Sequence, residues 1–320
     1  MNRKSKTWLI IAVILVVAGI IMFAAVMSEY NWDFSKLSTV KYVSNTYEVA
    51  EPFDNISIDV ETTKIEFVLS DGDECRIECY ESEKVLHHAS VQDGTLVINT
   101  TDTRKWYDYI CISIGTPKMT VYLPEDQYKT LRVETDTGDV TVPSTFSFEN
   151  LEVNGDTSDV TCLASVSDTI DISVSTGEIK VEGITVNRLN LSTSTGKINV
   201  SSVNVQNDID IETDTGAVLL TDATCKNFKA EGDTGKFVLK NVIASGSLYV
   251  DNETGGVVFE HSDAAEISVK TSTGDVTGSL LTEKVFVTET STGKISVPNT
   301  TSGGKCEIKT STGDIKITID

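Results

Sequence analysis

Hydrophobic and polar residues alternate along most of this chain, and a short turn interrupts the alternation at a fixed interval. Ten times between residues 137 and 313, a Thr is followed by a turn residue, once every 19 or 20 residues. The turn residues, called anchors below, are Gly138, Ser158, Gly177, Gly196, Gly216, Gly235, Gly255, Gly274, Gly293 and Gly313. A period this strict over more than half of the chain indicates one structural unit that is stacked on itself.

Apolar residues recur seven and five residues before each anchor, and two and four residues after it. Around Gly177, for example, these positions hold Ile170, Ile172, Ile179 and Val181. The positions between them are mostly polar, so each unit contains two short strands with one buried face. A helix does not fit, because the i, i+2 spacing would spread apolar residues over all of its faces, and Val, Ile and Thr favour strands. A weaker apolar pair further downstream indicates a third, less regular side.

The pattern predicts an all-β protein, a parallel β-solenoid of the β-helix type with coils of 19–20 residues. At ~3.3 Å per residue, one unit has a contour of roughly 65 Å, which suffices for two or three sides. An antiparallel meander is the alternative, but it explains less well why the same side chain recurs once per unit. We expect the repeated Thr to point inward or into the corner, where its hydroxyl would satisfy backbone groups of the turn.

The N-terminal segment has the features of a membrane anchor. Residues 1–7 contain Arg3, Lys4 and Lys6, and residues 8–27 form a run without charge that is long enough to span a bilayer. Positive charge before the span predicts a cytoplasmic tail at residues 1–7 and an extracytoplasmic C-terminal part. A cleaved signal peptide is the alternative, but the run is longer than usual and is followed by a poor cleavage site. The sequence therefore predicts a single-pass protein of the cell membrane.

Beyond the predicted transmembrane helix, the chain divides into three parts. Residues 28–49 are rich in aromatic residues and are expected to form an extracytoplasmic tether. Residues 50–130 alternate less regularly, which predicts irregular first coils with insertions that cap the membrane-near end. Residues 131–320 contain the regular solenoid repeats. The insertions hold His87, His88 and the aromatic residues around Trp106.

The chain is strongly acidic, with a formal net charge of −22. Without Arg3, Lys4 and Lys6, 23 basic residues stand against 48 acidic ones, a net charge of −25. This balance argues against a nucleic-acid partner, because phosphate contacts need a basic patch. It would instead attract cations or a basic partner.

Six cysteines are present, and an even number in an exported protein raises the question of disulfides. Cys162, Cys225 and Cys306 replace apolar residues of the repeat and lie three or more coils apart, so we interpret them as small buried hydrophobic residues. Either Cys75 or Cys79 could meet Cys111. The chain has no Cys-x-x-Cys pair, so its cysteine spacing does not indicate a zinc site.

One group of carboxylates is a candidate metal site. Asp136, Asp139, Asp156 and Asp159 would meet at one corner of two adjacent coils, ~4.8 Å apart, where calcium would relieve their repulsion. The spacing matches neither the glycine-rich calcium repeat nor an EF-hand loop, and Lys occupies the same position in later coils. A solvated turn without a cofactor is the simpler interpretation.

Two motifs that resemble catalytic sites are better explained by the repeat. Asp-Thr-Gly, the motif of aspartic proteases, begins at Asp136, Asp214 and Asp233, but Ser-Thr-Gly stands at the same position in other coils. Polysaccharide-cleaving solenoids need a fixed acid–base cluster on one face, and no coil of the repeat departs from the pattern to hold one. We therefore predict a protein that is not an enzyme.

The repeated turns carry a resemblance to a known family. The units at residues 272–276, 291–295 and 311–315 read Ser-Thr-Gly-Asp-Val, Ser-Thr-Gly-Lys-Ile and Ser-Thr-Gly-Asp-Ile. They resemble a bacterial domain family of unknown function that is often labelled "putative adhesin". The resemblance covers roughly residues 50–320. It implies one N-terminal span, an external β-repeat domain and, in some members, a gene beside envelope-stress regulators, and it transfers no catalytic residues.

These features predict a membrane-anchored cell-surface protein that binds another protein or the cell wall, in adhesion or in the envelope-stress response. Residues 305–320 have no evident polar cap, so we expect an exposed strand edge there that is open to a partner. The loop around Trp106 is the second expected contact surface. A calcium-dependent sensor or regulator of the envelope is the alternative function.

Overall fold

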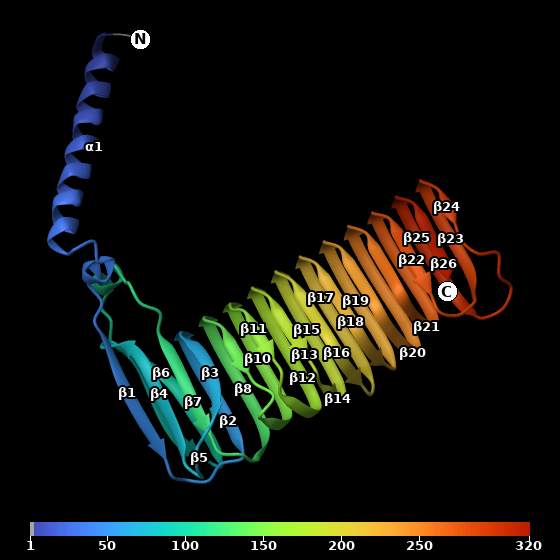
Figure 1. Ribbon diagram of the computed structural model, residues 1–320, viewed down its shortest axis with the longest axis horizontal. Coiled ribbons are helices and arrows are strands. Elements are labelled where there is room, and N and C mark those ends of the chain that lie inside the picture. Colours follow the sequence, from blue (N-terminus) through green and yellow to red (C-terminus); the bar gives the residue numbers. More distant parts are fainter. Residues whose placement is uncertain (1–2) are drawn as a thin grey trace.

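The computed structural model describes residues 3–320 and shows a rod of stacked β-coils with one helix at its N-terminal end (Figure 1). Helix α1 (Arg3–Glu29) is apolar along most of its length, and the segment Lys6–Glu29 is long and apolar enough to cross a membrane. Most of this segment is exposed, and Met27 near its C-terminal end is the buried apolar residue. A short 3-10 helix (Phe34–Leu37) follows, and a second one (Trp106–Tyr109) lies in a later loop.

The strands form a cap on the side of α1, β1–β7, and a stack, β8–β26. The cap strands are β1 (Tyr42–Val49), β2 (Asn55–Thr62), β3 (Lys64–Leu69), β4 (Cys75–Ser82), β5 (Val85–Gln92), β6 (Thr95–Asp102) and β7 (Lys118–Leu123). The stack strands are β8 (Gln127–Thr137), β9 (Val140–Val142), β10 (Ser147–Thr157), β11 (Val160–Cys162), β12 (Ser165–Thr176), β13 (Ile179–Glu182), β14 (Thr185–Val186), β15 (Arg188–Thr195), β16 (Ile198–Val205), β17 (Asp208–Thr215), β18 (Val218–Cys225), β19 (Asn227–Thr234), β20 (Phe237–Thr254), β21 (Val257–Thr273), β22 (Val276–Leu280), β23 (Lys284–Thr292), β24 (Ile295–Ser296), β25 (Gly304–Thr312) and β26 (Ile315–Ile319).

Pairing in the stack is parallel and joins residues at the same distance from their anchors. Ile170 of β12 is in register with Leu151 of β10 and Leu189 of β15, and Ile179 of β13 is in register with Ile198 of β16. These side chains are fully buried. Because each buried Val, Leu or Ile contributes about 1.5–3 kcal/mol, the inward ladders hold the rod together. The predicted parallel solenoid is confirmed, and the antiparallel meander is excluded for the stack.

The repeated Thr before each anchor does not point inward as expected. In every coil of the repeat this Thr is exposed, and only its backbone joins the neighbouring coil, as when the Gly177 N–H donates to the Thr195 carbonyl at 2.9 Å. The inward position lies two residues earlier. There the hydroxyls of Thr271 and Thr310 donate to carbonyls of anchor glycines at 3.2 and 3.1 Å. The chain bends after this inward residue, so the alternation of the strand stops before it reaches the repeated Thr.

The anchor glycines are needed because neighbouring turns lie very close together. Gly255 has a φ of +138°, and a Cβ atom there would lie 1.7 Å from the Gly235 carbonyl oxygen. Only a residue without a side chain fits such an approach.

The third side of the coil forms as well, beyond a second corner. Val203 and Val205 of β16 are buried on it. The corner lies six residues after the anchor, where Ser202, Asp222 and Asn241 have positive φ values of 51–55°. Asn and Asp tolerate this left-handed conformation better than most residues.

At the end of the solenoid next to α1, the order of strands in space differs from their order in the chain. Strand β2 lies between β8 and β6, and β3 lies between β9 and β7. Beyond them the pairing turns antiparallel: β4 pairs with β7 and β1, and β5 pairs with β6. The cap therefore closes the solenoid with strands that run against the direction of the stack.

The distal end is also out of order. Strand β25 is inserted between β21 and β23, and β26 lies between β22 and β24. The outermost coil is therefore formed by β23 and β24. The expectation that residues 305–320 form the exposed end is wrong, because they are the penultimate coil in space.

Candidate functional site

The four predicted calcium ligands occupy one corner of two adjacent coils. The register pairs Thr137 with Thr157 and Val140 with Val160, so the acidic residues Asp136, Asp139, Asp156 and Asp159 stand at equivalent positions. All four are exposed.

Two of these carboxylates have a backbone partner in the next coil. Asp139 Oδ1 accepts a hydrogen bond from the Asp159 N–H at 3.4 Å, and Asp159 Oδ1 accepts one from the Glu178 N–H at 2.7 Å. Asp275 accepts the Asp314 N–H in the same way, at 2.7 Å. A carboxylate after the anchor therefore ties one turn to the next, a role that needs no cation. Calcium binding at this corner stays a prediction.

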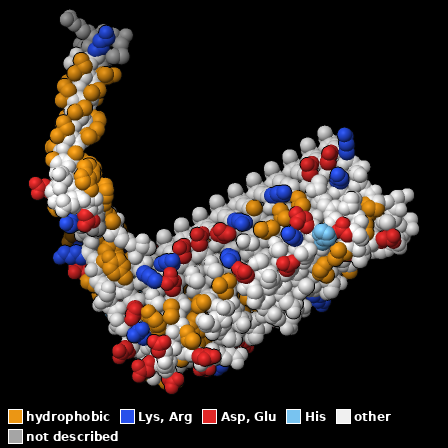
Figure 2. Space-filling model, in the orientation of Figure 1, with side chains coloured by type: hydrophobic (Ala, Val, Ile, Leu, Met, Phe, Trp, Pro, Cys, Tyr) orange, Lys and Arg blue, Asp and Glu red, His pale blue; other side chains and the backbone are white. Residues whose placement is uncertain are grey.

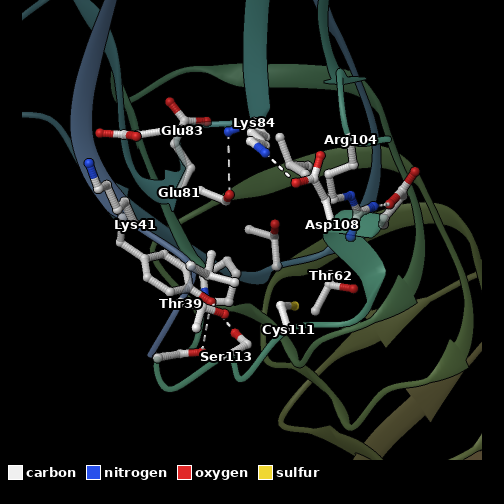
Figure 3. Close-up of a pocket in the computed structure, with 18 of the residues that line it drawn as sticks. Thr39, Lys41, Thr62, Glu81, Glu83, Lys84, Arg104, Asp108, Cys111 and Ser113 are labelled. Atoms are coloured by element: carbon white, nitrogen blue, oxygen red, sulfur yellow. Dashed lines mark hydrogen bonds and ion pairs between the residues drawn. The ribbon is translucent and has the colours of Figure 1, made fainter. Parts of the chain in front are cut away.

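A cavity of about 600 Å³ lies in the cap, where the repeat is broken (Figure 3). Its walls come from four segments that are distant in sequence, one of which is the β2–β3 turn at residues 61–63. Thr39 and Lys41 lie before β1, Glu81 and Lys84 lie at the β4–β5 turn, and Arg104, Asp108 and Cys111 lie in the loop between β6 and β7.

Glu81 is the buried charge at the floor of this cavity. Cys75, Ile77, Cys79 and Glu81 all face inward from β4, so its carboxylate continues a hydrophobic row. Asn45 Nδ2 and the Tyr47 hydroxyl donate to Glu81 Oε1 at 2.6 and 3.0 Å. The partners compensate for the burial of the carboxylate. Burial and the hydrogen bond to Glu81 raise the pKa of the Tyr47 hydroxyl.

His87 of β5 completes this buried group. Its backbone N–H donates to Glu81 Oε2 at 2.7 Å, and its Nδ1 lies 2.5 Å from the same oxygen. On the other side of the ring, Nε2 lies 3.2 Å from Thr63 Oγ1. Cys79 is buried beside this pair, and burial raises the pKa of its thiol to about 12.

The rim of the cavity is held by ion pairs of the β6–β7 loop. The Arg104 guanidinium donates to Asp102 and to Glu61, each at 2.7 Å. Its hydrogen bonds hold the pKa of Asp102 at about 2. A second ion pair joins Lys84 to Asp108 across the cavity mouth.

The same loop is bonded to the segment that leads to α1. Thr39 N donates to the Ile112 carbonyl at 2.8 Å, and the hydroxyls of Tyr42 and Ser113 are 2.6 Å apart. Large apolar side chains on the loop remain exposed, namely Trp106, Tyr107, Tyr109, Ile110 and Ile112. The loop therefore presents an apolar surface close to the segment that leads to α1.

All six cysteines are free thiols. Cys162, Cys225 and Cys306 are buried in the stack, which confirms their interpretation as small hydrophobic residues. Cys111 is exposed on the loop, whereas Cys75 and Cys79 are buried in the cap.

The group of Cys79, Glu81 and His87 was missed from the sequence. Motif spacing gives no signal for it, because the three residues follow no metal-binding pattern of known spacing. The available signal was the alternation of inward and outward side chains along β4. A carboxylate at an inward position of an otherwise apolar strand must find a buried partner.

At the distal end, the core of the solenoid is open. Ile295 of β24 stands two residues after its anchor, a position that is fully buried in Val276 and Ile315, yet its own exposed fraction is 46%. Val285 and Val287 of β23 are also exposed. Figure 2 shows mixed acidic and basic side chains over the visible face of the stack, and hydrophobic ones along α1.

A parallel β-solenoid with an irregular cap, carried on one apolar N-terminal helix, is the class of protein that this architecture defines. The sequence profile of the Toastrack family, DUF4097, matches residues 53–318, and the chain belongs to this family. The predicted resemblance to a β-repeat domain of unknown function is thereby confirmed.

Solved structures share the fold at low sequence identity. A protein named "putative adhesin" from Parabacteroides merdae is 14% identical with a TM-score of 0.51, over 76% of this chain and 97% of that one. A "putative lipid binding protein" from Parabacteroides distasonis is 16% identical with a TM-score of 0.47, over 86% and 97%. A "putative adhesin" from Bacteroides fragilis is 14% identical with a TM-score of 0.44, over 87% and 97%. No curated protein matches this chain.

Proposed function

We propose that this chain is a non-enzymatic, single-pass membrane protein whose extracytoplasmic solenoid binds a partner protein through its distal coil. The apolar helix and the basic residues before it support a cytoplasmic N-terminus. The family and its adhesin-named structural relatives support a role in binding. Polar residues of the repeated turns form hydrogen bonds to neighbouring coils. These bonds give the turn residues a structural role, so their presence does not require a catalytic one.

The observation that carries the proposal is the open core at the distal coil. Ile295 is 46% exposed at a position that other coils bury completely, and β23 has a paired strand on one side only. An unpaired strand edge beside exposed apolar side chains accepts an extended strand from a partner. Residues 281–303 contain two acidic and two basic residues and are therefore neutral, in a chain with a net charge of −22. A partner strand meets little repulsion there.

The proposal is tested by photo-crosslinking of the full chain in bacterial membranes. A photoreactive residue in place of Val287 should form adducts of defined mass with a partner protein. The same residue in place of Ser194, an exposed turn residue in the middle of the stack, should not. Adding Ile295→Lys should remove the Val287 adducts, because an inward-pointing charge blocks strand addition.

Equal adduct patterns from Val287 and Ser194 would contradict the distal contact. An adduct with twice the mass of the chain would show that the partner at the distal coil is a second copy of the same protein. Deletion of residues 305–320 would not test the contact, since it would remove the coil on which β23 rests.

A calcium-dependent sensor of the envelope is the second candidate. It is favoured by the register that places Asp136 beside Asp156 and Asp139 beside Asp159 on adjacent coils. Calorimetry of the full chain should then show heat with calcium, and Asp136→Asn with Asp156→Asn should abolish it. The absence of both heat and a shift in melting temperature at millimolar calcium would end this candidate.

A further inference from the structure

Three side chains of different chemistry converge beneath the floor of the cap cavity. The Cys79 sulfur, a Glu81 carboxylate oxygen and a His87 ring nitrogen all lie within 4.8 Å of one another. Their residues are 1%, 0% and 2% exposed. Cys79 and Glu81 project inward from one face of β4, and His87 reaches them from β5 across the turn.

The surroundings of this group orient its atoms toward one point. Asn45 and Tyr47 hold Glu81 Oε1, which leaves Oε2 turned toward His87. Thr63 Oγ1 lies at hydrogen-bond distance from the far ring nitrogen of His87, Nε2. Bound metals have this kind of outer partner: the second nitrogen of a ligating His bonds to an oxygen, and ligating carboxylates are themselves hydrogen-bonded.

We propose that Cys79, Glu81 and His87 bind one divalent transition metal ion of the zinc type. A thiolate and an imidazole are ligands for zinc and not for calcium or magnesium, which prefer oxygen. On metal binding, the ring proton of His87 moves from Nδ1, where it faces Glu81, to Nε2, where it is donated to Thr63 Oγ1, and Nδ1 coordinates through the lone pair that this frees. The Cys79 thiol loses its proton to solvent as the metal enters.

The site would have three protein ligands and one open position. Metal–ligand distances of about 2.0–2.3 Å require the three atoms to move closer together, which side-chain rotation can achieve. Glu81 and His87 line the cavity of about 600 Å³, so its solvent reaches the metal from that side. A water molecule or a small ligand in the cavity completes the coordination. This inference concerns the cap and does not depend on a partner at the distal coil.

Metal uptake by the full chain in detergent tests the inference. The protein is stripped with a chelator and dialysed against Zn²⁺ or Co²⁺. We expect one ion per chain, a thiolate-to-cobalt charge-transfer absorption with Co²⁺, and a rise in melting temperature with Zn²⁺. Cys79→Ser and His87→Asn should each abolish the absorption.

Matched controls separate the site from general effects. Cys75→Ser changes a buried thiol on the same face of β4, and His88→Asn changes the exposed neighbour of His87, so both should keep the cobalt absorption. Tyr47→Phe should weaken zinc binding by roughly tenfold, as loss of an outer partner does, while circular dichroism shows an intact fold. The inference is overturned if the stripped wild type binds no more zinc than a Cys79→Ser/His87→Asn variant, or if its cobalt complex lacks the sulfur absorption.

Discussion

The middle of the solenoid and its two ends bury different kinds of polar group. Among the described residues, the middle buries neutral ones, such as Thr193 and Asn252, whose side chains donate to the carbonyls of Gly177 and Gly235 in the preceding coil. The ends bury charged or titratable ones: Glu81 and His87 in the cap, and Asp263 and Lys284 near the distal coil. Neutral groups that bond one coil to the next suit a stack whose units are alike. Buried charges need one particular partner, so we expect them to specify how the stack ends.

The largest expected effect is in the middle. Gly255→Ala should lower the free energy of unfolding by at least ~5 kcal/mol or prevent folding, because the new Cβ would lie 1.7 Å from the Gly235 carbonyl oxygen. Denaturant unfolding of the full chain measures it. Gly72→Ala in a cap loop, where a Cβ meets nothing within 4 Å, is the control and should change little. If Gly255→Ala lowered the free energy of unfolding only slightly, neighbouring turns would be able to move apart to make room for the new Cβ.

The next effect concerns the distal end. Lys284 and Asp263 form a buried ion pair, with their closest atoms 2.6 Å apart. Lys284→Met should cost about 3–5 kcal/mol, because it leaves a buried charge without its partner. Hydrogen exchange of β23 should report the loss. Lys284→Met combined with Asp263→Leu should recover most of it, and Lys305→Met, which removes an exposed pair with Glu307, should have little effect. If the double variant were as unstable as the single one, the pair would not be what specifies the end.

A smaller effect is expected from a buried hydroxyl of the stack. Thr271→Val keeps the shape of the side chain but removes the hydrogen bond to the Gly255 carbonyl. The free energy of unfolding should fall by about 1 kcal/mol. The exposed Thr273→Val is the matched control and should be neutral. An equal loss at both positions would mean that the effect comes from strand propensity and not from the inward hydroxyl.

The smallest effect is the pH dependence of the cap loop. The folded-state pKa of Asp102 is held at about 2 by Arg104, below the unfolded value of ~3.9. The ionised carboxylate therefore stabilises the folded loop above about pH 4, and this contribution is lost as the pH falls toward 2. Hydrogen exchange of residues 102–112 should be slower in the wild type than in an Asp102→Asn variant at pH 6, and the two rates should converge near pH 2. If the difference in exchange between the two proteins did not change with pH, contacts other than the ionised Asp102 would be what orders the loop.

Much of the fold could be predicted from the sequence, because a coil repeats its inward residues at fixed distances from the anchor. Ile170 and Ile179 could be placed in the core for that reason. The orientation of the repeated Thr could not be predicted, because the inward–outward alternation of a strand does not continue through a turn. The order of coils at the two ends could not be predicted either. The Thr-Gly units are so similar that the sequence does not specify which unit pairs with which.

The candidate metal group was hidden for a different reason. Motif rules describe ligands at fixed spacings, as in Cys-x-x-Cys, whereas Cys79, Glu81 and His87 meet only because β4 and β5 are joined by a tight turn and closed in by β1 and Thr63. The acidic residues around Asp139, by contrast, were located correctly by the repeat. Their bonds to the backbone of the next coil could not be foreseen, because they depend on side-chain orientation at the turn.

The inserted position of β25 and β26 has a consequence for biogenesis. Strands β23 and β24 precede in the chain the strands on which they rest, β25 and β26. During synthesis the growing rod ends at β21 and β22 until residues 304–319 are available, and the segment that will cover it has no place to dock. Residues 304–319 therefore complete the stack, and a chain truncated before them would be left with residues 281–303 as a loose segment that proteases can cut. The distal coil forms only after the strands that follow it in sequence.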